Sequence, residues 1–261
     1  MINNIKIENL SVKYNDKIVF KSIDLYIPNN SIVSIVGRNG IGKSTFVYCL
    51  SKRCSEYSGN IYINGKNLKL YSIKELSQTL SILYSNCNLY NNLKVKDFLV
   101  MGFTNEMNAL DKPSEKNYSE AYRILNLFNK QYVYNKPIYS LSSGELQIIK
   151  FARVLLQNTP IMVFDEPMEN LDIETQLLIL KLLDNLHKEG HTILVITHNL
   201  RHMLELKGKL LLLSDNEYVY CNSDDIINDD IMKSYTPVNT SYLQDKNDMV
   251  ITFFDQKKIY I

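Results

Sequence analysis

Eight consecutive residues, Gly37 to Ser44, combine three glycines with a lysine and a hydroxyl side chain in the order Gly-Arg-Asn-Gly-Ile-Gly-Lys-Ser. This order matches the phosphate-loop pattern G-x-x-x-x-G-K-[ST] without a mismatch. Glycines let the backbone turn so that successive N–H groups point into one concavity, and a following helix adds the positive end of its dipole. Lys43 supplies a positive charge, and the Ser44 hydroxyl is a suitable ligand for Mg²⁺. The stretch therefore predicts a binding loop for a polyphosphate and its magnesium ion.

Two further groups of polar residues follow apolar runs later in the chain. Asp165 and Glu166 come directly after the run 161–164, and His198 comes directly after the run 192–197. Taken singly, an Asp-Glu pair after a strand is more often a helix start, and a lone histidine is more often structural. Beside a phosphate loop, Asp165 suits Mg²⁺ held through a water, Glu166 suits proton acceptance from an attacking water, and His198 suits contact with a terminal phosphate.

The elements expected to position these groups are strands covered on both faces. The runs at 31–36, 161–164, 192–197 and 210–213 are continuous and apolar, and helical patterns follow the first two from residue 45 and over 173–188. Strands that alternate with helices predict a mainly parallel sheet. Ligands of such sheets bind at the carboxyl ends of the strands, where all three groups are expected to meet.

The N-terminal region has a different pattern. Apolar residues alternate with period two between Ile5 and Ile27, with a turn expected at Asn15-Asp16, and a second short strand with an Asn-Gly turn is expected over 59–65. This predicts an antiparallel flank on the nucleotide-binding core. Tyr14, at the end of one of these strands, is placed either to stack on a purine or simply to pack in the sheet.

Helical spacing dominates residues 89–157, in the segments 95–101, 118–129 and 144–157, with Pro113 and Pro137 between them. We interpret 89–157 as a helical insertion in one domain of residues 1–261, whose core comprises 1–88 and 158–261.

Composition excludes several classes of function. Lys plus Arg number 29 against 28 for Asp plus Glu, so no basic surplus indicates nucleic acid as a partner. The four cysteines lack metal-binding spacing, and no run approaches the roughly 18 apolar residues of a membrane span. The first ten residues lack the pattern of a signal peptide, so a cytoplasmic location is expected.

The stretch Leu141-Ser142-Ser143-Gly144-Glu145 resembles the L-S-G-G-Q signature of the ATP-binding subunits of ABC transporters, and the resemblance covers nearly the whole chain. It implies an α/β P-loop NTPase core with an inserted helical subdomain, and a dimer that sandwiches two ATP molecules. In such a dimer, Ser142, Ser143, Gly144 and Glu145 contact the ATP bound by the other subunit. The resemblance also implies a loop at Asp172 that crosses the dimer, adenine stacking by Tyr14, and a switch role for His198.

The resemblance implies ATP and Mg²⁺ as cofactors, with Ser44 and Asp165 at the metal and Glu166 and His198 as the catalytic pair. The residues expected to bind ATP are Tyr14, Gly37, Arg38, Asn39, Gly40, Ile41, Gly42, Lys43, Ser44 and Thr45.

Departures from the family pattern bear on the same site. Ser85 stands where the family usually has a glutamine that links Mg²⁺ to the permease contact, and serine is too short to span that distance alone. Asn86 is a candidate substitute, whereas Gln78 lies too early in the chain. Ser143 and Glu145 replace a glycine and a glutamine of the signature.

The stretch 93–102 resembles the subunits that energise import of ferric siderophores, haem and cobalamin, and the tail 224–235 is similar to the ends of those subunits. This implies a location on the inner face of the cell membrane, bound to transmembrane permease subunits and served indirectly by a substrate-binding protein. The alternatives are a subunit of another importer or an exporter, a soluble ABC ATPase such as one for iron–sulfur assembly, and a module that senses ATP without hydrolysis.

Overall fold

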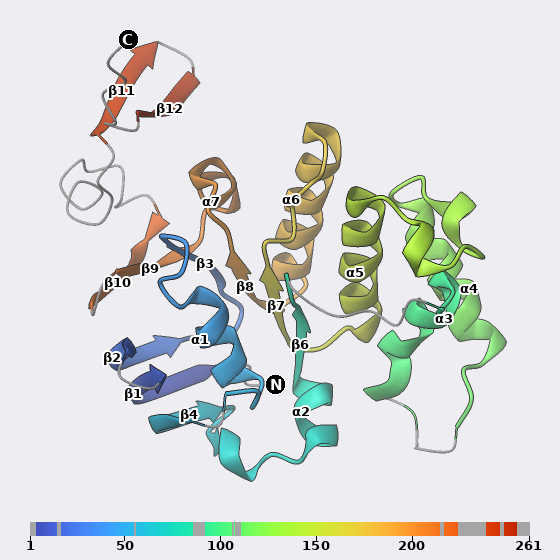
Figure 1. The fold of residues 1–261 in the computed structure, drawn as a ribbon, viewed down its shortest axis with the longest axis horizontal. Helices are drawn as coiled ribbons and strands as arrows, with labels where there is room; N and C mark the ends of the chain where they lie inside the picture. The colour runs from blue at the N-terminus through green and yellow to red at the C-terminus, as the bar shows by residue number, and fades with distance from the viewer. Residues whose placement is uncertain are drawn as a thin grey trace.

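The computed structural model describes residues 4–14, 17–54, 56–85, 92–105, 107, 111–214, 217–223, 239–245 and 248–254. A six-stranded sheet forms its centre (Figure 1). Its strands stand in the order β10 (Glu217–Asn222), β9 (Lys209–Ser214), β3 (Ile32–Gly37), β8 (Thr192–Ile196), β7 (Ile161–Asp165) and β6 (Leu80–Leu83). All neighbours from β9 to β6 pair in parallel, and β10 runs antiparallel to β9. The predicted parallel sheet is confirmed.

Continuous burial explains the strand sequences of this sheet. Every residue of β7 and of β8 is buried, because helices or a second sheet cover both faces. The carboxyl ends of β3, β6, β7 and β8 lie along one edge, which brings residue 37, residues 84 and 85, residues 165 and 166, and residues 197 and 198 together.

An antiparallel sheet confirms the predicted N-terminal flank. Its order is β2 (Lys17–Ile27), β1 (Ile5–Tyr14), β4 (Tyr57–Ile63) and β5 (Lys66–Asn67). The inward residues of β1 and β4 share one apolar core with α1 (Lys43–Leu50) and with β3. Helix α1 is therefore fixed between the two sheets, and the loop before it has a rigid support. The turn expected at Asn15-Asp16 lies outside the described residues.

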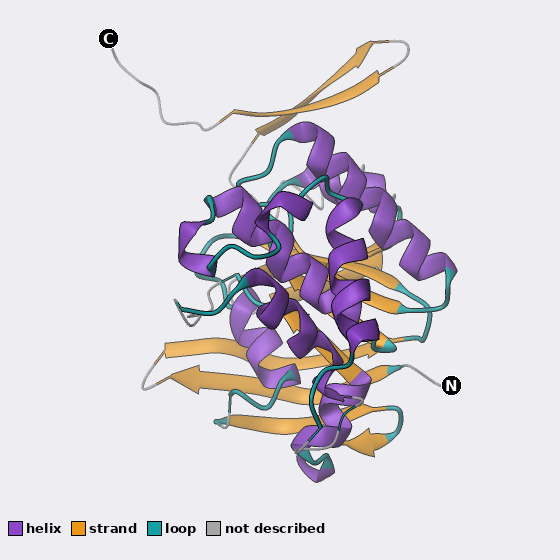
Figure 2. Cartoon of the chain, turned by 90° about the vertical axis from the view of Figure 1, so that its right-hand side faces the viewer, coloured by secondary structure: helices purple, strands orange, loops and turns teal. Residues whose placement is uncertain are grey.

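Helices cover the opposite face of the central sheet, as Figure 2 shows. Helices α5 (Ser143–Gln157) and α6 (Ile173–Lys188) pack on β7 and β8 in a second apolar core. Within it Phe151 lies with its ring centre 5.0 Å from that of Phe164 and 6.1 Å from that of Phe128. Helix α7 (Leu200–Leu206) lies against β3 and β9 through Met203.

A third apolar core belongs to the helices α3 (Val95–Val100), α4 (Glu115–Asn126) and α5. Because α5 contributes one face to this core and another to the central sheet, it connects the helical segment to the strands. The helical character predicted for 89–157 is present, and its description as an insertion remains our interpretation.

The remaining elements are short. They are η1 (Leu68–Leu70), α2 (Ile73–Thr79), η2 (Met101–Asn105), η3 (Gln131–Val133), η4 (Ile138–Ser140) and a hairpin of β11 (Asn239–Asp245) and β12 (Asp248–Phe254). No helix in the described part of the chain is both long and apolar enough to cross a membrane. The predicted tail at 224–235 lies outside the described residues.

Candidate functional site

The predicted phosphate loop connects β3 to α1. Gly42 has φ of +111°, and a Cβ there would stand 2.4 Å from Cγ1 of Val19 and 2.7 Å from Cε1 of Phe20. No side chain fits that space, and an L-residue rarely adopts that backbone angle. The close approach of two β2 side chains and the left-handed backbone angle therefore both favour glycine at position 42.

The ammonium of Lys43 is turned back onto its own loop. Its Nζ donates to the carbonyl oxygens of Gly37 at 2.7 Å and Arg38 at 3.0 Å, and the side chain is buried. Burial lowers the pKa of Lys43, while the carboxylates of Glu166 and Asp165 act in the opposite direction. The loop thus holds a desolvated positive charge beside its concavity, as binding of a polyanion requires.

Three side-chain oxygens meet at the end of β7. Oδ2 of Asp165 accepts hydrogen bonds from Oγ of Ser85 at 2.8 Å and Oγ of Ser44 at 3.3 Å, and the Asp165 side chain is buried. One carboxylate with two hydroxyls suits Mg²⁺, which prefers oxygen and usually completes its shell with water and substrate phosphates. The residues present therefore fit the implied metal, and Ser85 belongs to the same cluster as Ser44 and Asp165.

Glu166 has a strained backbone and a perturbed carboxyl group. Its φ is +51°, while its N–H donates to the carbonyl of Ile196 at 3.0 Å and its own carbonyl accepts from Nε2 of Gln147 at 2.7 Å. Oε2 of Glu166 lies 3.0 Å from Nδ1 of His198. Burial raises the pKa of Glu166, and the contact with His198 opposes this rise. A left-handed non-glycine residue held by neighbours on both sides is typical of functional sites.

These groups surround one cavity of about 420 Å³. Its lining residues are Asn39, Gly40, Gly42, Lys43, Ser44, Thr45, Ser85, Asp165, Glu166, Glu169 and His198. Figure 1 shows the loop before α1 and the ends of β7 and β8 that border it. The structure therefore brings the predicted phosphate, metal and catalytic residues together, whereas Gly37, Arg38 and Ile41 belong to the loop without lining the cavity. Tyr14 ends β1, and its side chain lies outside the described residues, so its stacking on adenine stays a prediction.

The stretch 142–145 forms the N-terminus of α5, away from the described lining of that cavity. Oγ of Ser142 accepts from the N–H of Glu145 at 3.2 Å, and Oε2 of Glu145 accepts from the N–H of Ser142 at 2.8 Å. The hydroxyl of Tyr132 donates to Oε1 of Glu145 at 2.7 Å. This double cap fixes the first turn of the helix, whose free N–H groups and dipole favour an anion.

Gly144, in the first turn of α5, contacts the loop that follows β7, and Asp172 ends that loop. A Cβ on Gly144 would stand 2.9 Å from the carbonyl oxygen of Asn170, so glycine allows α5 to approach the loop after β7. Asp172, at the end of that loop, caps α6 by accepting from the N–H of Thr175 at 2.8 Å. Asp172 therefore has a structural role in addition to the one predicted from the resemblance.

Sequence reasoning missed three residues of the site. Gln147 holds the carbonyl of Glu166, Glu169 lines the cavity, and Lys150 donates from Nζ to the carbonyl of Ser85 at 3.0 Å. Gln147 stands within the apolar run Leu146–Ile149, and a polar side chain in such a run is expected to be buried and to need a hydrogen-bond partner. This pattern could have identified Gln147 from the sequence. Gln78 donates to the carbonyl of Asn105, and Asn86 lies outside the described residues.

Comparison with known proteins gives a consistent result. Residues 20–169, more than half of the chain, match the family described as ABC transporter. The chain is 27% identical to the iron(3+)-hydroxamate import ATP-binding protein FhuC of Bacillus subtilis over 246 residues, which cover 94% of this chain and 91% of that protein. It is 31% identical to a probable iron chelatin transport ATP-binding protein of Helicobacter pylori over 219 residues, covering 80% and 86% of the two chains.

Solved structures show the same fold. An inward-facing putative metal-chelate type ABC transporter aligns with a TM-score of 0.79 at 22% identity, covering 97% of both chains. A dimeric bacterial ABC transporter cassette aligns with a TM-score of 0.73 at 25% identity, covering 80% of this chain and 94% of that one.

Proposed function

The chain belongs to the ABC transporter family and is an ATPase of that family, and from this premise we propose that it energises import of an iron chelate or a similar metal complex. The observation that carries ATP hydrolysis as the source of energy is the cavity in which Lys43, Ser44, Ser85, Asp165 and Glu166 meet. The names of the relatives in Bacillus subtilis and Helicobacter pylori support iron-chelate import as the process that hydrolysis drives.

The mechanism follows from the residues around the cavity. The loop N–H groups and the Lys43 ammonium bind the ATP phosphates, and Ser44 and Asp165 hold Mg²⁺. When held there, Mg²⁺ would supply positive charge to neutralise the charge that develops on the phosphate oxygens. Glu166 accepts the proton of the attacking water, and its raised pKa makes it a better base than an ordinary carboxylate. His198, in contact with Glu166, orients that carboxylate and reaches the terminal phosphate.

A dimer of the chain accounts for the position of residues 142–145. They form a capped helix N-terminus that is absent from the described lining of the cavity, although a helix N-terminus is suited to phosphate. A second chain that presents Ser142, Ser143, Gly144 and Glu145 to the bound ATP satisfies both facts. In this arrangement Asp172 lies close to the boundary between the two chains. The dimeric cassette among the similar structures supports this arrangement.

A second, larger cavity of about 840 Å³ supports docking on transmembrane permease subunits. It lies between β6 with α2 on one side and α3 with α5 on the other. Apolar side chains such as Ile73 and Phe98 alternate there with Arg53, Lys150 and Arg153, and no acidic residue is among the described residues that line it. An amphipathic permease segment with a carboxylate suits this chemistry. Such docking would hold the chain on the cytoplasmic face of the membrane, where a substrate-binding protein acts only indirectly.

The test is uptake of a ⁵⁵Fe-labelled hydroxamate chelate by cells that lack the chain and are complemented with wild type or Lys43→Ala. The tagged chain is also purified from solubilised membranes to identify its partners. Uptake that needs Lys43, together with a co-purified many-spanning permease, supports the proposal. Uptake that is unchanged without the chain, with only soluble partners recovered, would remove import and leave the ATPase.

A further inference from the structure

Lys150 lies between the two cavities. It lines the 840 Å³ cavity on α5, and its Nζ donates to the carbonyl oxygen of Ser85 at 3.0 Å. Ser85 lines the 420 Å³ cavity, and its Oγ donates to Oδ2 of Asp165 at 2.8 Å. Two hydrogen bonds, joined through the covalent bonds of Ser85, therefore connect an ammonium in one cavity to the Asp165 carboxylate in the other.

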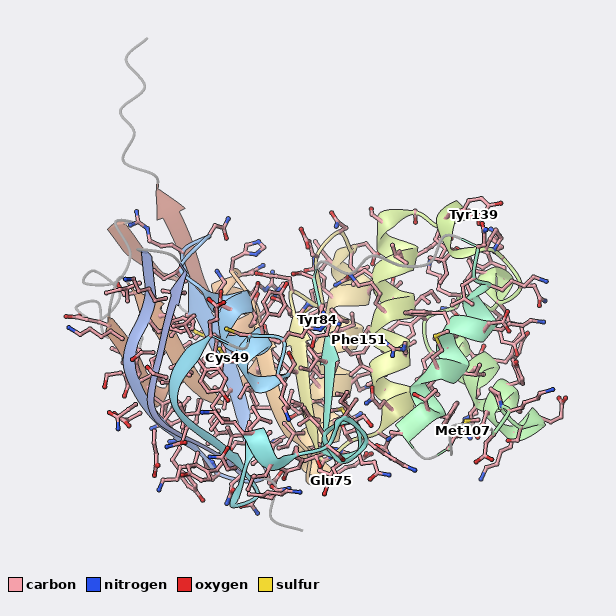
Figure 3. All side chains as sticks on the ribbon, turned by 60° about the horizontal axis from the view of Figure 1, so that its bottom comes forward. Cys49, Glu75, Tyr84, Met107, Tyr139 and Phe151 are labelled. Carbon is pink, nitrogen blue, oxygen red and sulfur yellow. The ribbon has the colours of Figure 1, made fainter. Side chains whose placement is uncertain are left out.

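The Lys150 end of this connection is anchored to β7, and the Ser85 end is anchored to α1 and the residues that follow it. Phe151, next to Lys150, is fully buried and packs on Phe164, which directly precedes Asp165. On the other side, Tyr84 packs between Tyr48, with ring centres 5.9 Å apart, and the Arg53 guanidinium, 3.9 Å from the ring centre. In the view of Figure 3, the labelled side chains of Tyr84 and Phe151 both lie in the central part of the molecule. The backbones of residues 150 and 85 are therefore fixed relative to Asp165.

The Ser85 side chain is short, so its hydroxyl stays on Asp165 only if the backbone of residue 85 is held in place. Its side chain has one rotatable bond to the hydroxyl, so the position of the oxygen follows the position of the backbone. A hydrogen bond from a charged donor is about twice as strong as one between neutral groups, and the Lys150 ammonium gives this bond to the Ser85 carbonyl. Oγ is thereby held at the carboxylate.

We propose that Lys150 is a positioning residue of the metal site, which holds Ser85 so that its hydroxyl remains on Asp165. The inference rests on the proposed function, because it assumes that Asp165, Ser44 and Ser85 surround a divalent cation bound with ATP. In this inference, two residues together replace the glutamine that the family usually has at position 85. Ser85 contacts the carboxylate, and Lys150 holds Ser85 in place.

The experiment measures the Mn²⁺ affinity of the protein with ATPγS, as the loss of the free Mn²⁺ signal in electron paramagnetic resonance beyond the loss that ATPγS alone causes. Lys150→Met is expected to weaken Mn²⁺ binding about tenfold, the lower range for loss of a group that orients a metal ligand. Lys150→Gln, whose amide is too short to reach, shows the same loss, and Lys150→Arg restores binding. Ser85→Ala is as weak as Lys150→Met, and the double variant is no weaker, since the two residues act as one unit.

Lys52 offers a matched control. Its ammonium also donates to main-chain carbonyls, those of Tyr71 at 2.7 Å and Lys69 at 3.2 Å, and neither acceptor belongs to the metal site. Lys52→Met therefore keeps wild-type Mn²⁺ affinity. Circular dichroism and binding of a fluorescent ATP analogue in EDTA verify that each variant is folded and retains its nucleotide site.

The outcomes separate the two claims. If wild type with ATPγS fails to bind Mn²⁺, the proposed function is wrong. If wild type binds and Lys150→Met and Lys150→Gln bind equally well, the function stands and the role of Lys150 is overturned. Equal losses in Lys150→Met and Lys52→Met would also overturn it, because they indicate a general effect of removing a lysine.

Discussion

Nδ1 of His198 lies 3.0 Å from Oε2 of Glu166, at the carboxyl ends of two adjacent strands. Burial raises the pKa of Glu166, and the hydrogen bond and the electrostatic interaction with His198 lower it. The two effects oppose each other at the group that we propose as the proton acceptor, so we expect His198 to influence the pH range in which Glu166 accepts a proton.

The pH dependence of hydrolysis tests this relationship. A base must be deprotonated, so the acid limb of the kcat profile should have its midpoint above the ordinary glutamate pKa of 4.5. His198→Ala removes the interaction that lowers the pKa and should move that midpoint to still higher pH. Phosphate release measured from pH 5 to 9 checks the direction, with His187→Ala, a half-buried residue at the end of α6 outside the lining of the cavity, as the control. A midpoint that moves to lower pH in His198→Ala would contradict the assignment.

Gly144→Ala tests the proposed contact of residues 142–145 with the ATP of a second chain separately from ATP binding at the phosphate loop. The added methyl would stand 2.9 Å from the carbonyl of Asn170, so the first turn of α5 must move away from that loop. We expect ATP affinity of the isolated chain to stay within about twofold, while turnover falls at least about tenfold because the second phosphate contact is displaced. Fluorescence titration and phosphate release give the two values. Loss of both together would place residue 144 in the same ATP site as Lys43.

Phe151→Ala tests the junction of the helical segment with the central sheet. The ring is fully buried between Phe128 and Phe164, and its loss leaves a cavity beside β7. The free energy of unfolding should fall by about 3–5 kcal/mol, the usual cost of removing a buried aromatic side chain. Urea denaturation gives the value, and Tyr139→Ala, an exposed side chain on η4, should change it by less than about 0.5 kcal/mol. A cost below about 1 kcal/mol would show that the core around residue 151 does not hold α5.

Much of the site was predictable because it depends on local sequence. The phosphate loop, the acidic pair after β7 and the histidine after β8 each follow an apolar strand, and parallel strands place their carboxyl ends together. The capping of α5 by Ser142 and Glu145 is also local, since the partners stand three residues apart. Patterns of this kind need no knowledge of the tertiary structure.

The contacts that sequence reasoning missed join distant parts of the chain. Lys150 and Ser85 are 65 residues apart, and Ser85 and Asp165 are 80 apart, so only the packing of α5 beside β6 and β7 shows that they meet. The left-handed backbone of Glu166 was also not predictable from the sequence. Its two main-chain hydrogen bonds, to Ile196 and Gln147, join segments that are distant in the chain. The sequence indicated that serine at position 85 is too short for the usual role of a glutamine, whereas the structure places its hydroxyl on the Asp165 carboxylate.

The most direct test of the central claim, that this cavity hydrolyses ATP in a dimer, is the oligomeric state of Glu166→Gln with and without Mg-ATP. Light scattering after size-exclusion chromatography measures it, alongside phosphate release. We predict that Glu166→Gln becomes a dimer with ATP and releases phosphate at least about 100-fold more slowly than wild type, because it binds ATP without a base. Lys43→Ala should neither dimerise nor hydrolyse. Wild-type phosphate release by both variants, with no dimer formed, would contradict the account.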